Sequence, residues 1–381
     1  MNVRNSMAWG MLFPAMCMLM SGVSAVAQHQ PTITTIDAPG AGAAYGYGTE
    51  SIAINPAGVV AGFYVGLSNV VHAYVWTDGK FTTFDGPGVP SHASTDPFSP
   101  PSSWINTDAP GTYALGIDAT GAVTGYYIDA SNVAHGYLRA PDGRFTSFDV
   151  PHAGAGSGQG TFASNMNLEG TIAGNYTDKN NVSHGFVRAP DGAITEFDPP
   201  GAQGTWLGWF QCISTTGAVT GYYADSGGVL HGFVRDPNGK ITTFEVAAKG
   251  LTGGQGTETW AINPAGTSVG VFVDANSVNH GLVRAADGKI TVFDVPLAPA
   301  GANTVAEAID PAGAVVGFYN DANGVHHGFL RAVDGTFTYF DVPAAGNGFH
   351  QGTVPLGNNP EDTVIGFWID SDWVWHGFVR K

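Results

Sequence analysis

One short segment, with His-Gly followed by an aromatic residue or leucine and then by Arg two residues later, recurs along the chain at a nearly constant interval. Its histidines are His135, His184, His231, His280, His327 and His376, and the variant "HAYVW" adds His72. Successive copies lie 63, 49, 47, 49, 47 and 49 residues apart. A period of about 40–50 residues is typical of repeat architectures, in which each repeat forms one supersecondary unit. The repeat therefore constrains the fold more than any single motif does.

Each repeat is predicted to form four short strands. The first ends in a turn such as Asn55-Pro56-Ala57-Gly58, and the second, such as "AVVGFY", is rich in β-branched and aromatic residues. The third is "HGFLR" or a variant, and an Asp-Gly or Asn-Gly pair, a strong hairpin signal, joins it to the fourth, "FTSFDVP". A glycine recurs within the second strand, as at Gly125 and Gly317. We expect it to mark the close approach of a neighbouring sheet.

The two ends of the chain complement each other. The last repeat stops at "HGFVRK", after its third strand, whereas "ITTIDAPGAG", from Ile33 to Gly42, has the pattern of a fourth strand before the first repeat begins. Four-stranded units of this length, closed radially, form β-propellers. We predict an all-β, seven-bladed β-propeller over residues 28–381, in which strand 33–40 completes the last blade and residues 88–110 form an insertion between blades one and two.

The first residues are predicted to be a secretory signal peptide. Arg4 is followed by an apolar stretch from Met7 to Met20, and Ala25-Val26-Ala27 fits a small-residue cleavage site. We therefore assign residues 1–27 to the signal and expect a secreted protein, extracellular or periplasmic, with no membrane span. Cys212 is the single cysteine that follows the signal, so we expect no intramolecular disulfide. We also expect a monomer.

The charge of the chain argues against nucleic acid as a partner. The formal net charge is −17, and a phosphate backbone is bound by basic surfaces that displace its counterions. Only 12% of the residues are charged, while Gly numbers 55 and Pro 23. This composition favours a turn-rich β protein over a helical or disordered one.

The repeat resembles the HAF family of extracellular bacterial repeat proteins. The resemblance rests on "HGF.R...G.FT.FDVPGA" and covers nearly all of the chain after the signal. It implies export and a repeat fold. It implies no activity, cofactor or catalytic residue.

Residues found in every repeat are expected to hold the fold together. We expect each histidine, such as His135, to be buried and to donate to an acid about six residues upstream, here Asp129. We expect each arginine of the pattern to pair with an acid of its own or the next blade, and Trp76 replaces it in blade one. These arginines are Arg139, Arg188, Arg235, Arg284, Arg331 and Arg380.

Bound calcium is the alternative explanation for the acidic turns. Turns such as "DASNV" and "DANSV" alternate Asp and Asn, as calcium loops do. Hairpin turns favour the same residues, and the final glutamate of an EF-hand loop is missing. No metal site or cofactor is assigned on this pattern.

Positions that break the repeat are the candidates for function. Between Thr205 and Ser214 the chain has nine positions where the other repeats have six, which adds "WLGWFQC" near the start of a first strand. We predict a ligand site at this channel mouth, formed by Trp206, Trp209, Phe210, Trp260, Tyr113, Trp104, Glu50, Glu258, Glu307 and His350. Aromatic rings beside carboxylates suit a sugar. The alternative is that these rings only plug the channel.

Three functions fit this sequence. The first is a non-catalytic binding or scaffold module for a glycan, an envelope polymer or a protein. The second is a carbohydrate-active enzyme, a polysaccharide lyase or glycoside hydrolase. Hydrolysis needs two carboxyls about 5–10 Å apart, and Glu50, Glu258 and Glu307 are the available acids. The third is a structural or adhesive surface protein. No catalytic residue is assigned.

Overall fold

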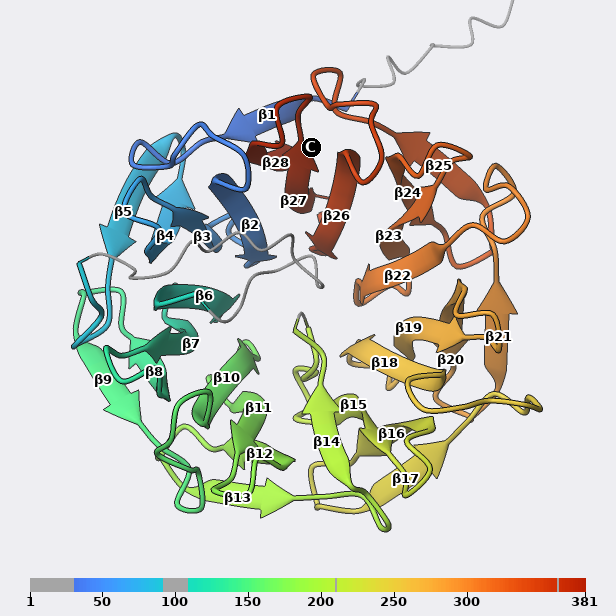
Figure 1. The fold of residues 1–381 in the computed structure, drawn as a ribbon, viewed down its shortest axis with the longest axis horizontal. Helices are drawn as coiled ribbons and strands as arrows, with labels where there is room; N and C mark the ends of the chain where they lie inside the picture. Colours follow the sequence, from blue (N-terminus) through green and yellow to red (C-terminus); the bar gives the residue numbers. More distant parts are fainter. Residues whose placement is uncertain (1–30, 92–108, 210, 362) are drawn as a thin grey trace, which may run out of the picture. The chain divides into compact units, whose positions relative to one another are not determined.

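The computed structural model describes residues 31–91, 109–209, 211–361 and 363–381, which form 28 β-strands and contain no helix (Figure 1). In particular, none of the described residues belongs to a helix able to cross a membrane. Residues Thr32–Lys381 form one compact unit. The predicted signal, 1–27, and residues 92–108 of the predicted insertion lie outside the described residues.

The strands pair in antiparallel sets that follow the order of the chain. The first strands of the sets are β2 (Gly48–Ile54), β6 (Gly111–Ile117), β10 (Gly160–Met166), β14 (Gly204–Leu207), β18 (Gly256–Ile262), β22 (Thr304–Ile309) and β26 (Gly352–Asn358). The second strands are β3 (Val60–Val65), β7 (Val123–Ile128), β11 (Ile172–Thr177), β15 (Val219–Ala224), β19 (Ser268–Val273), β23 (Val315–Asn320) and β27 (Val364–Ile369).

The third and fourth strands are the "HGF.R" and "FTSF" segments. The third strands are β4 (Val71–Thr77), β8 (Ala134–Arg139), β12 (Ser183–Arg188), β16 (Leu230–Arg235), β20 (Asn279–Arg284), β24 (His326–Arg331) and β28 (Trp375–Arg380). The fourth strands are β5 (Lys80–Phe84), β9 (Phe145–Phe148), β13 (Ile194–Phe197), β17 (Ile241–Phe244), β21 (Ile290–Phe293) and β25 (Phe337–Phe340). The remaining strand, β1 (Ile33–Ile36), pairs antiparallel with β28, with Ile36 opposite Gly377.

At five junctions between sets, a glycine that opens a first strand bridges the third strand of the preceding set. Gly111 bridges Val71 of the preceding set and has φ of +150°. A Cβ at this glycine would lie 2.3 Å from the carbonyl oxygen of Val71. Because a side chain would block this approach, these junctions depend on the glycine of the "GT" step, whereas β22 has Asn303 in its place.

The glycine within each second strand also allows a close approach, but its neighbour differs from the one predicted. A Cβ on Gly125 would lie 1.8 Å from the carbonyl oxygen of Tyr113, at the β-bulge of β6 between Ala114 and Gly116. Strands β6 and β7 belong to the same set. The expectation of a neighbouring sheet at this position was therefore wrong, because the bulge in the adjacent strand fills the space.

Hydrophobic clusters lie between successive sets. One cluster packs Ala61 and Ala73 of the set β2–β5 against Val123 and Tyr137 of the set β6–β9. The threonine of the "GT" step adds a polar link, since Thr112 Oγ1 accepts a hydrogen bond of 2.8 Å from the N–H of Gly86, which follows β5. The faces between sets therefore form the core.

The repeated histidines bind acids, but chiefly not the acids predicted. His135 Nδ1 lies 3.0 Å from Asp149, the acid that follows the fourth strand, while its Nε2 lies 3.6 Å from the predicted partner, Asp129. The histidines of the other sets make the same Nδ1 contact with a closing acid, at distances of 2.7–2.9 Å. Their side chains are 17–27% exposed, so they are half-buried rather than buried. Each stacks on an aromatic ring, as His135 does on Tyr127.

The upstream acid instead stabilises its own turn. Asp129 Oδ1 accepts hydrogen bonds from the N–H groups of Ser131 and Val133, at 2.8 and 2.9 Å. Equivalent bonds recur in the other acidic turns, at Asp178, Asp225, Asp274, Asp321 and Asp370. The Asp and Asn pattern that suggested calcium is therefore explained by turn hydrogen bonds.

The repeated arginines lie over aromatic rings rather than beside acids. Arg139 Cζ is 4.5 Å from the centre of the Phe84 ring, which closes the fourth strand of the preceding set. The other arginines repeat this contact at 4.6–5.0 Å. Among the described residues, the ion pairs within 4.0 Å are all formed by histidines. The predicted Arg–carboxylate pairs are thus replaced by cation–π contacts between sets.

Candidate functional site

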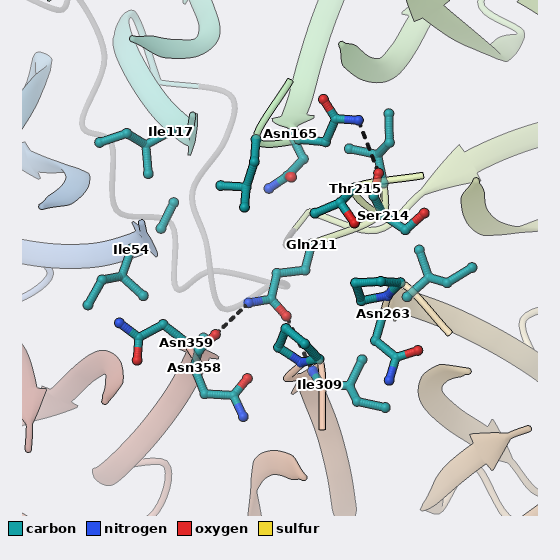
Figure 2. A pocket seen from close by; sticks show the side chains of 18 of the residues that line it. Ile54, Ile117, Asn165, Gln211, Ser214, Thr215, Asn263, Ile309, Asn358 and Asn359 are labelled. Atoms are coloured by element: carbon teal, nitrogen blue, oxygen red, sulfur yellow. Dashed lines mark hydrogen bonds between the residues drawn. The ribbon is translucent and has the colours of Figure 1, made fainter. Parts of the chain in front are cut away.

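A pocket of about 130 Å³ lies where the first strands end, as the close-up in Figure 2 shows. Strands from several sets contribute to its wall, and their last residues are hydrophobic or carry amides. The residues labelled in Figure 2 are Ile54, Ile117, Asn165, Gln211, Ser214, Thr215, Asn263, Ile309, Asn358 and Asn359. No charged side chain is among the lining residues of the described chain. The wall therefore suits neutral groups.

Gln211 reaches across this pocket from the set β14–β17. Its Nε2 donates to the carbonyl oxygen of Asn358 at 3.0 Å, and its Oε1 accepts from the N–H of Ile309 at 3.3 Å. Its own carbonyl oxygen accepts from the N–H of Ile262. The backbone of Gln211 is left-handed, with φ of +51°. The extra residues of this set thus place Gln211 where it joins three other first strands, two through its amide side chain and one through its carbonyl oxygen.

Asparagines surround the pocket and link neighbouring turns. Asn55 Nδ2 donates to the carbonyl oxygen of Asp118, and Asn167 Nδ2 donates to that of Ser214. Asn358 is 4% exposed, and its Oδ1 has no hydrogen-bond partner in the described structure. A buried acceptor without a partner is costly, so a donor entering the pocket would be stabilised there.

Of the residues predicted for the ligand site, Glu50, Tyr113, Trp206 and Glu258 lie near the starts of their first strands. Several of the predicted residues meet between β14, β15 and β18. Trp206 stacks on Tyr222, with ring centres 5.6 Å apart. Trp260 Nε1 donates to Glu258 Oε2 at 3.2 Å. Burial and then the charge of Glu258 raise the pKa of Tyr222, which places the two side chains in electrostatic range. We call Trp206, Tyr222, Glu258 and Trp260 the aromatic cluster.

The carboxyl of Glu258 is poised to change its charge near neutrality. Burial raises the pKa of Glu258 to about 7, and the hydrogen bond from Trp260 opposes this shift. A carboxyl of this kind accepts hydrogen bonds as an anion and can donate one when protonated. The aromatic cluster therefore combines flat apolar surfaces with one carboxyl group.

Two other predicted aromatic residues, Tyr113 and Trp209, lie against Tyr126. Tyr113 is fully buried, stacks on Tyr126 at 4.7 Å and donates its hydroxyl hydrogen to the carbonyl oxygen of Ala109. It belongs to a hydrophobic cluster that Trp260 also contacts. Trp209 is 37% exposed, and its ring centre lies 6.5 Å from that of Tyr126. Of these rings, Trp209 is the one most open to a ligand.

The three predicted glutamates do not act on one another. Burial raises the pKa of Glu50 well above its usual value and raises that of Glu307 to about 8. For Glu50, Glu258 and Glu307, no other carboxylate of the described chain contributes to the shift. Burial therefore accounts for all three raised pKa values, without a charge from a second carboxylate.

The remaining candidates are dispersed. His350 lies beside His326, with Nδ1 of His350 3.4 Å from Nε2 of His326. Trp104 and Phe210 lie outside the described residues.

Sequence reasoning missed four residues of these sites: Gln211, Tyr222, Asn358 and His326. The first carried a signal, because it belongs to the insertion that lengthens the step from Thr205 to Ser214. The others lie at ordinary strand positions, and only the fold brings them to a site.

Comparison with solved structures supports the fold. The chain is similar to selenomethionine-substituted virginiamycin B lyase from Staphylococcus aureus, with a TM-score of 0.56, 14% identity, and coverage of 92% of this chain and 100% of that chain. It is also similar to the β-propeller domain of the Trilobed protease from Pyrococcus furiosus, with a TM-score of 0.52, 9% identity, and coverage of 89% and 97%. Such low identities concern the fold alone.

The strand pairing and these likenesses together define an all-β protein with a β-propeller fold. No protein-family model matches the chain, and no curated protein matches it.

Proposed function

We propose that the chain is a secreted, seven-bladed β-propeller that acts as a non-catalytic binding module for a glycan or an envelope polymer. The aromatic cluster and Trp209 form the binding surface. The single observation that carries this proposal is the stacked pair of Trp206 and Tyr222 beside the Glu258 carboxyl. The function is assigned from this site, since a propeller fold alone does not imply one.

Contacts at the chain ends support seven blades in a closed ring. Strand β1 supplies the fourth strand of the set β26–β28, and Asp37 binds His376 as the closing acids bind the other histidines. Gly48 bridges Trp375 as Gly111 bridges Val71. The last set therefore meets the first through the same contacts that join other neighbours.

The chemistry of the aromatic cluster supports a sugar ligand. Indole and phenol rings offer flat apolar faces, which suit the C–H faces of a sugar, while a carboxylate accepts hydroxyl hydrogen bonds. Small-molecule sites commonly combine apolar walls with a few polar groups in this way. The predicted signal at 1–27 and the resemblance to HAF proteins motivate the secreted location.

Binding is favoured over glycoside hydrolysis because no charge of a second carboxylate acts on Glu258. Hydrolysis uses two carboxyls about 5–10 Å apart across the sugar. Glu258 has the raised pKa that a general acid needs, but neither Glu50 nor Glu307 contributes to it. A single isolated carboxyl suits recognition.

A binding screen tests the proposal. The purified protein is applied to arrays of glycans and bacterial envelope polysaccharides, and hits are quantified by calorimetry. Trp206→Ala and Trp209→Ala should each weaken binding at least tenfold. Tyr339→Ala is the matched control, because Tyr339 is 36% exposed, close to the 37% of Trp209, but lies on the fourth strand β25.

Two results would overturn the proposal. One is the absence of any glycan ligand, and the other is equal loss of binding in the Tyr339 control. Turnover of a bound polysaccharide that disappears in Glu258→Gln would favour the enzyme instead. Fractionation of cells that express the chain with and without residues 1–27 tests the secreted location.

A further inference from the structure

Two neighbouring sets contribute to the aromatic cluster. Trp206 and Glu258 each follow the threonine of a "GT" step, in β14 and in β18, so they occupy equivalent positions of consecutive sets. Tyr222 is the cross-strand partner of Trp206 in β15. Strand β18 lies against β15 at this level, because Thr259 Oγ1 donates to the carbonyl oxygen of Gly221 at 2.7 Å. The two sets therefore place the carboxyl of Glu258 within electrostatic range of Tyr222.

The end of β14 also packs closely on β18. A Cβ at Gly208, which follows β14, would overlap the carbonyl oxygen of Trp260. Trp260 Nε1 in turn donates to Glu258 Oε2 at 3.2 Å. The rings of Trp206 and Tyr222 are stacked, with centres 5.6 Å apart. Each of the four residues of the aromatic cluster is partly exposed. The three rings and the carboxyl thus form one site that solvent can reach.

Glu258 has no positively charged partner in the part of the chain that the structure describes. The ion pairs of the described residues do not include it. Its Oε2 accepts from Trp260, and no group of the described residues donates a hydrogen bond to Oε1. Burial raises the pKa of Glu258 to about 7, and no basic side chain opposes this shift. The ionised carboxyl therefore lacks the cation that would stabilise it.

Any charge at this site comes from Glu258. Burial, followed by the charge of Glu258, raises the pKa of Tyr222 further above its usual value of 10, so its hydroxyl stays neutral. The indole rings of the cluster do not ionise. Glu50 and Glu307 are only 4% and 8% exposed, whereas Glu258 is partly exposed. Of the three glutamates predicted for the ligand site, Glu258 is thus the one that a ligand can reach.

We propose that the aromatic cluster binds a positively charged amino sugar, whose ammonium group pairs with Glu258 Oε1. This inference rests on the proposed glycan-binding function and names the class of sugar. The faces of aromatic rings attract cations that lie within about 6 Å of the ring centre. An ammonium group at Glu258 therefore gains from both the carboxylate and the rings. A neutral sugar packs on the same rings but leaves the charge of Glu258 unbalanced.

The electrostatics of the whole chain favour the same class of ligand. The formal net charge of −17 attracts cationic polymers and repels acidic ones. Hydrogen bonds between an ammonium group and a carboxylate are stronger than those between neutral groups. The ammonium group pairs with the ionised form of Glu258. Where Glu258 is protonated in the free protein, binding therefore releases that proton to solvent.

Calorimetry on the full chain with two oligosaccharides that differ in one group tests the proposal. Glucosamine oligomers carry free amines, and N-acetylglucosamine oligomers of equal length carry neutral amides. Slightly below neutral pH, the parent protein should bind the free-amine form at least about tenfold more tightly. In Glu258→Gln, which keeps the shape of the side chain without its charge, this preference should fall below about threefold. Thermal unfolding checks that this variant is folded.

Glu169→Gln is the matched control. Glu169 is exposed in the turn that follows β10, so the variant removes one negative charge away from the aromatic cluster. It should keep the full preference for the free-amine form.

Each of the following outcomes would overturn the proposal. The parent protein binds neither oligomer, or binds the N-acetylated form as tightly as the free-amine form. The preference persists in Glu258→Gln, or it falls as far in Glu169→Gln, which would assign it to net charge alone. Binding of neutral glycans without any preference for amines would leave the proposed function standing. The absence of any glycan ligand would end both proposals, so the two failures are distinguishable.

Discussion

The outer hairpins and the first strands of the propeller differ in how far one set resembles the next. Along the third and fourth strands, the same contacts recur: His with the closing acid at 2.7–3.0 Å, and Arg over Phe at 4.5–5.0 Å. Along the first strands, the residue after the "GT" threonine or its equivalent changes in almost every set. The residues at this position are Glu50, Tyr113, Phe162, Trp206, Glu258, Val305 and Val354. The fold therefore demands the outer contacts and leaves the first strands free to vary.

In one pair of neighbouring sets, both members of the Arg–Phe contact are replaced. In β4 the repeated arginine is Trp76, and in β1, which precedes it in the order of sets, the repeated phenylalanine is Ile36. Trp76 packs against the same hydrophobic cluster as Ile36. A cation–π pair and an apolar pair thus serve the same purpose, provided that both members change together.

The largest loss of stability is expected at Gly125, where the backbone of β7 closely approaches that of β6. Gly125→Ala places a Cβ 1.8 Å from the carbonyl oxygen of Tyr113, so we expect a loss of at least about 3 kcal/mol in unfolding free energy. Gly121→Ala is the control, because Gly121 has φ of +88° and open space around its Cβ; it should cost only about 1–2 kcal/mol. Urea denaturation measures both. Equal losses would show that the bulge contact is not the constraint.

The next largest effect is the pH dependence of stability that arises from the buried glutamates of the first strands. Burial raises the pKa of Glu307 from its usual value of 4.5 to about 8, so the neutral form is favoured in the folded state. The contribution of the neutral Glu307 carboxyl to the free energy of unfolding is complete below the pKa of Glu307 in the unfolded chain. It is lost as the pH rises to and through the pKa of Glu307 in the folded protein. Between pH 5 and pH 8 we expect the unfolding free energy to fall by on the order of 3 kcal/mol. Glu258, with a pKa of about 7, adds to this loss.

Glu307→Gln should reduce this pH dependence, because an amide does not ionise. Glu361→Gln, at an exposed turn, should leave the dependence unchanged. Denaturation at a series of pH values separates the two variants. An equally steep loss in Glu307→Gln would mean that Glu307 ionises without penalty in the folded protein.

The contrast between the recurring outer hairpins and the variable first strands explains what the sequence could predict. The β-propeller fold followed from the period, and the four strands of each repeat followed from turn signals and β-branched residues. The partners of His135 and Arg139 were wrong because a partner depends on which strands lie side by side. Asp149 is 14 residues from His135 along the chain, and Phe84 belongs to another set. Periodicity does not report such contacts.

The candidate sites were predictable only in part, for a related reason. The insertion after Thr205 pointed to Trp206 and Trp209, and also contained Gln211. It could not show that Gln211 crosses to Ile309 and Asn358, which lie in other sets. His326 gave no signal, because its neighbour His350 lies in a loop that the fold brings beside it.

A smaller effect should come from the Arg–Phe contact, and it can be measured by a double-mutant cycle. Arg139→Ala and Phe84→Ala should show a coupling energy of about 0.5–1 kcal/mol, as expected for a partly exposed cation–π pair. The double replacement Arg139→Trp with Phe84→Ile copies the set that has Trp76 and Ile36. It should recover stability relative to Arg139→Trp alone. Simple additivity in thermal unfolding would contradict the idea of paired replacement.

The smallest effect belongs to a single histidine on the outer hairpins. The hydrogen bond to Asp341 raises the pKa of His327, so the charged ring is favoured in the folded state. For a raised histidine pKa, the stabilisation is complete below the unfolded value, near 6.5, and is lost as pH rises through the folded value. Exposed pairs contribute about 0.2–1 kcal/mol. His327→Gln should therefore lower the melting temperature by one or two degrees at pH 5 and by less at pH 8. Asp341→Asn should do the same, because it removes the other partner of the pair. If either variant were more destabilising at pH 8 than at pH 5, the charge on His327 would not be what stabilises the contact.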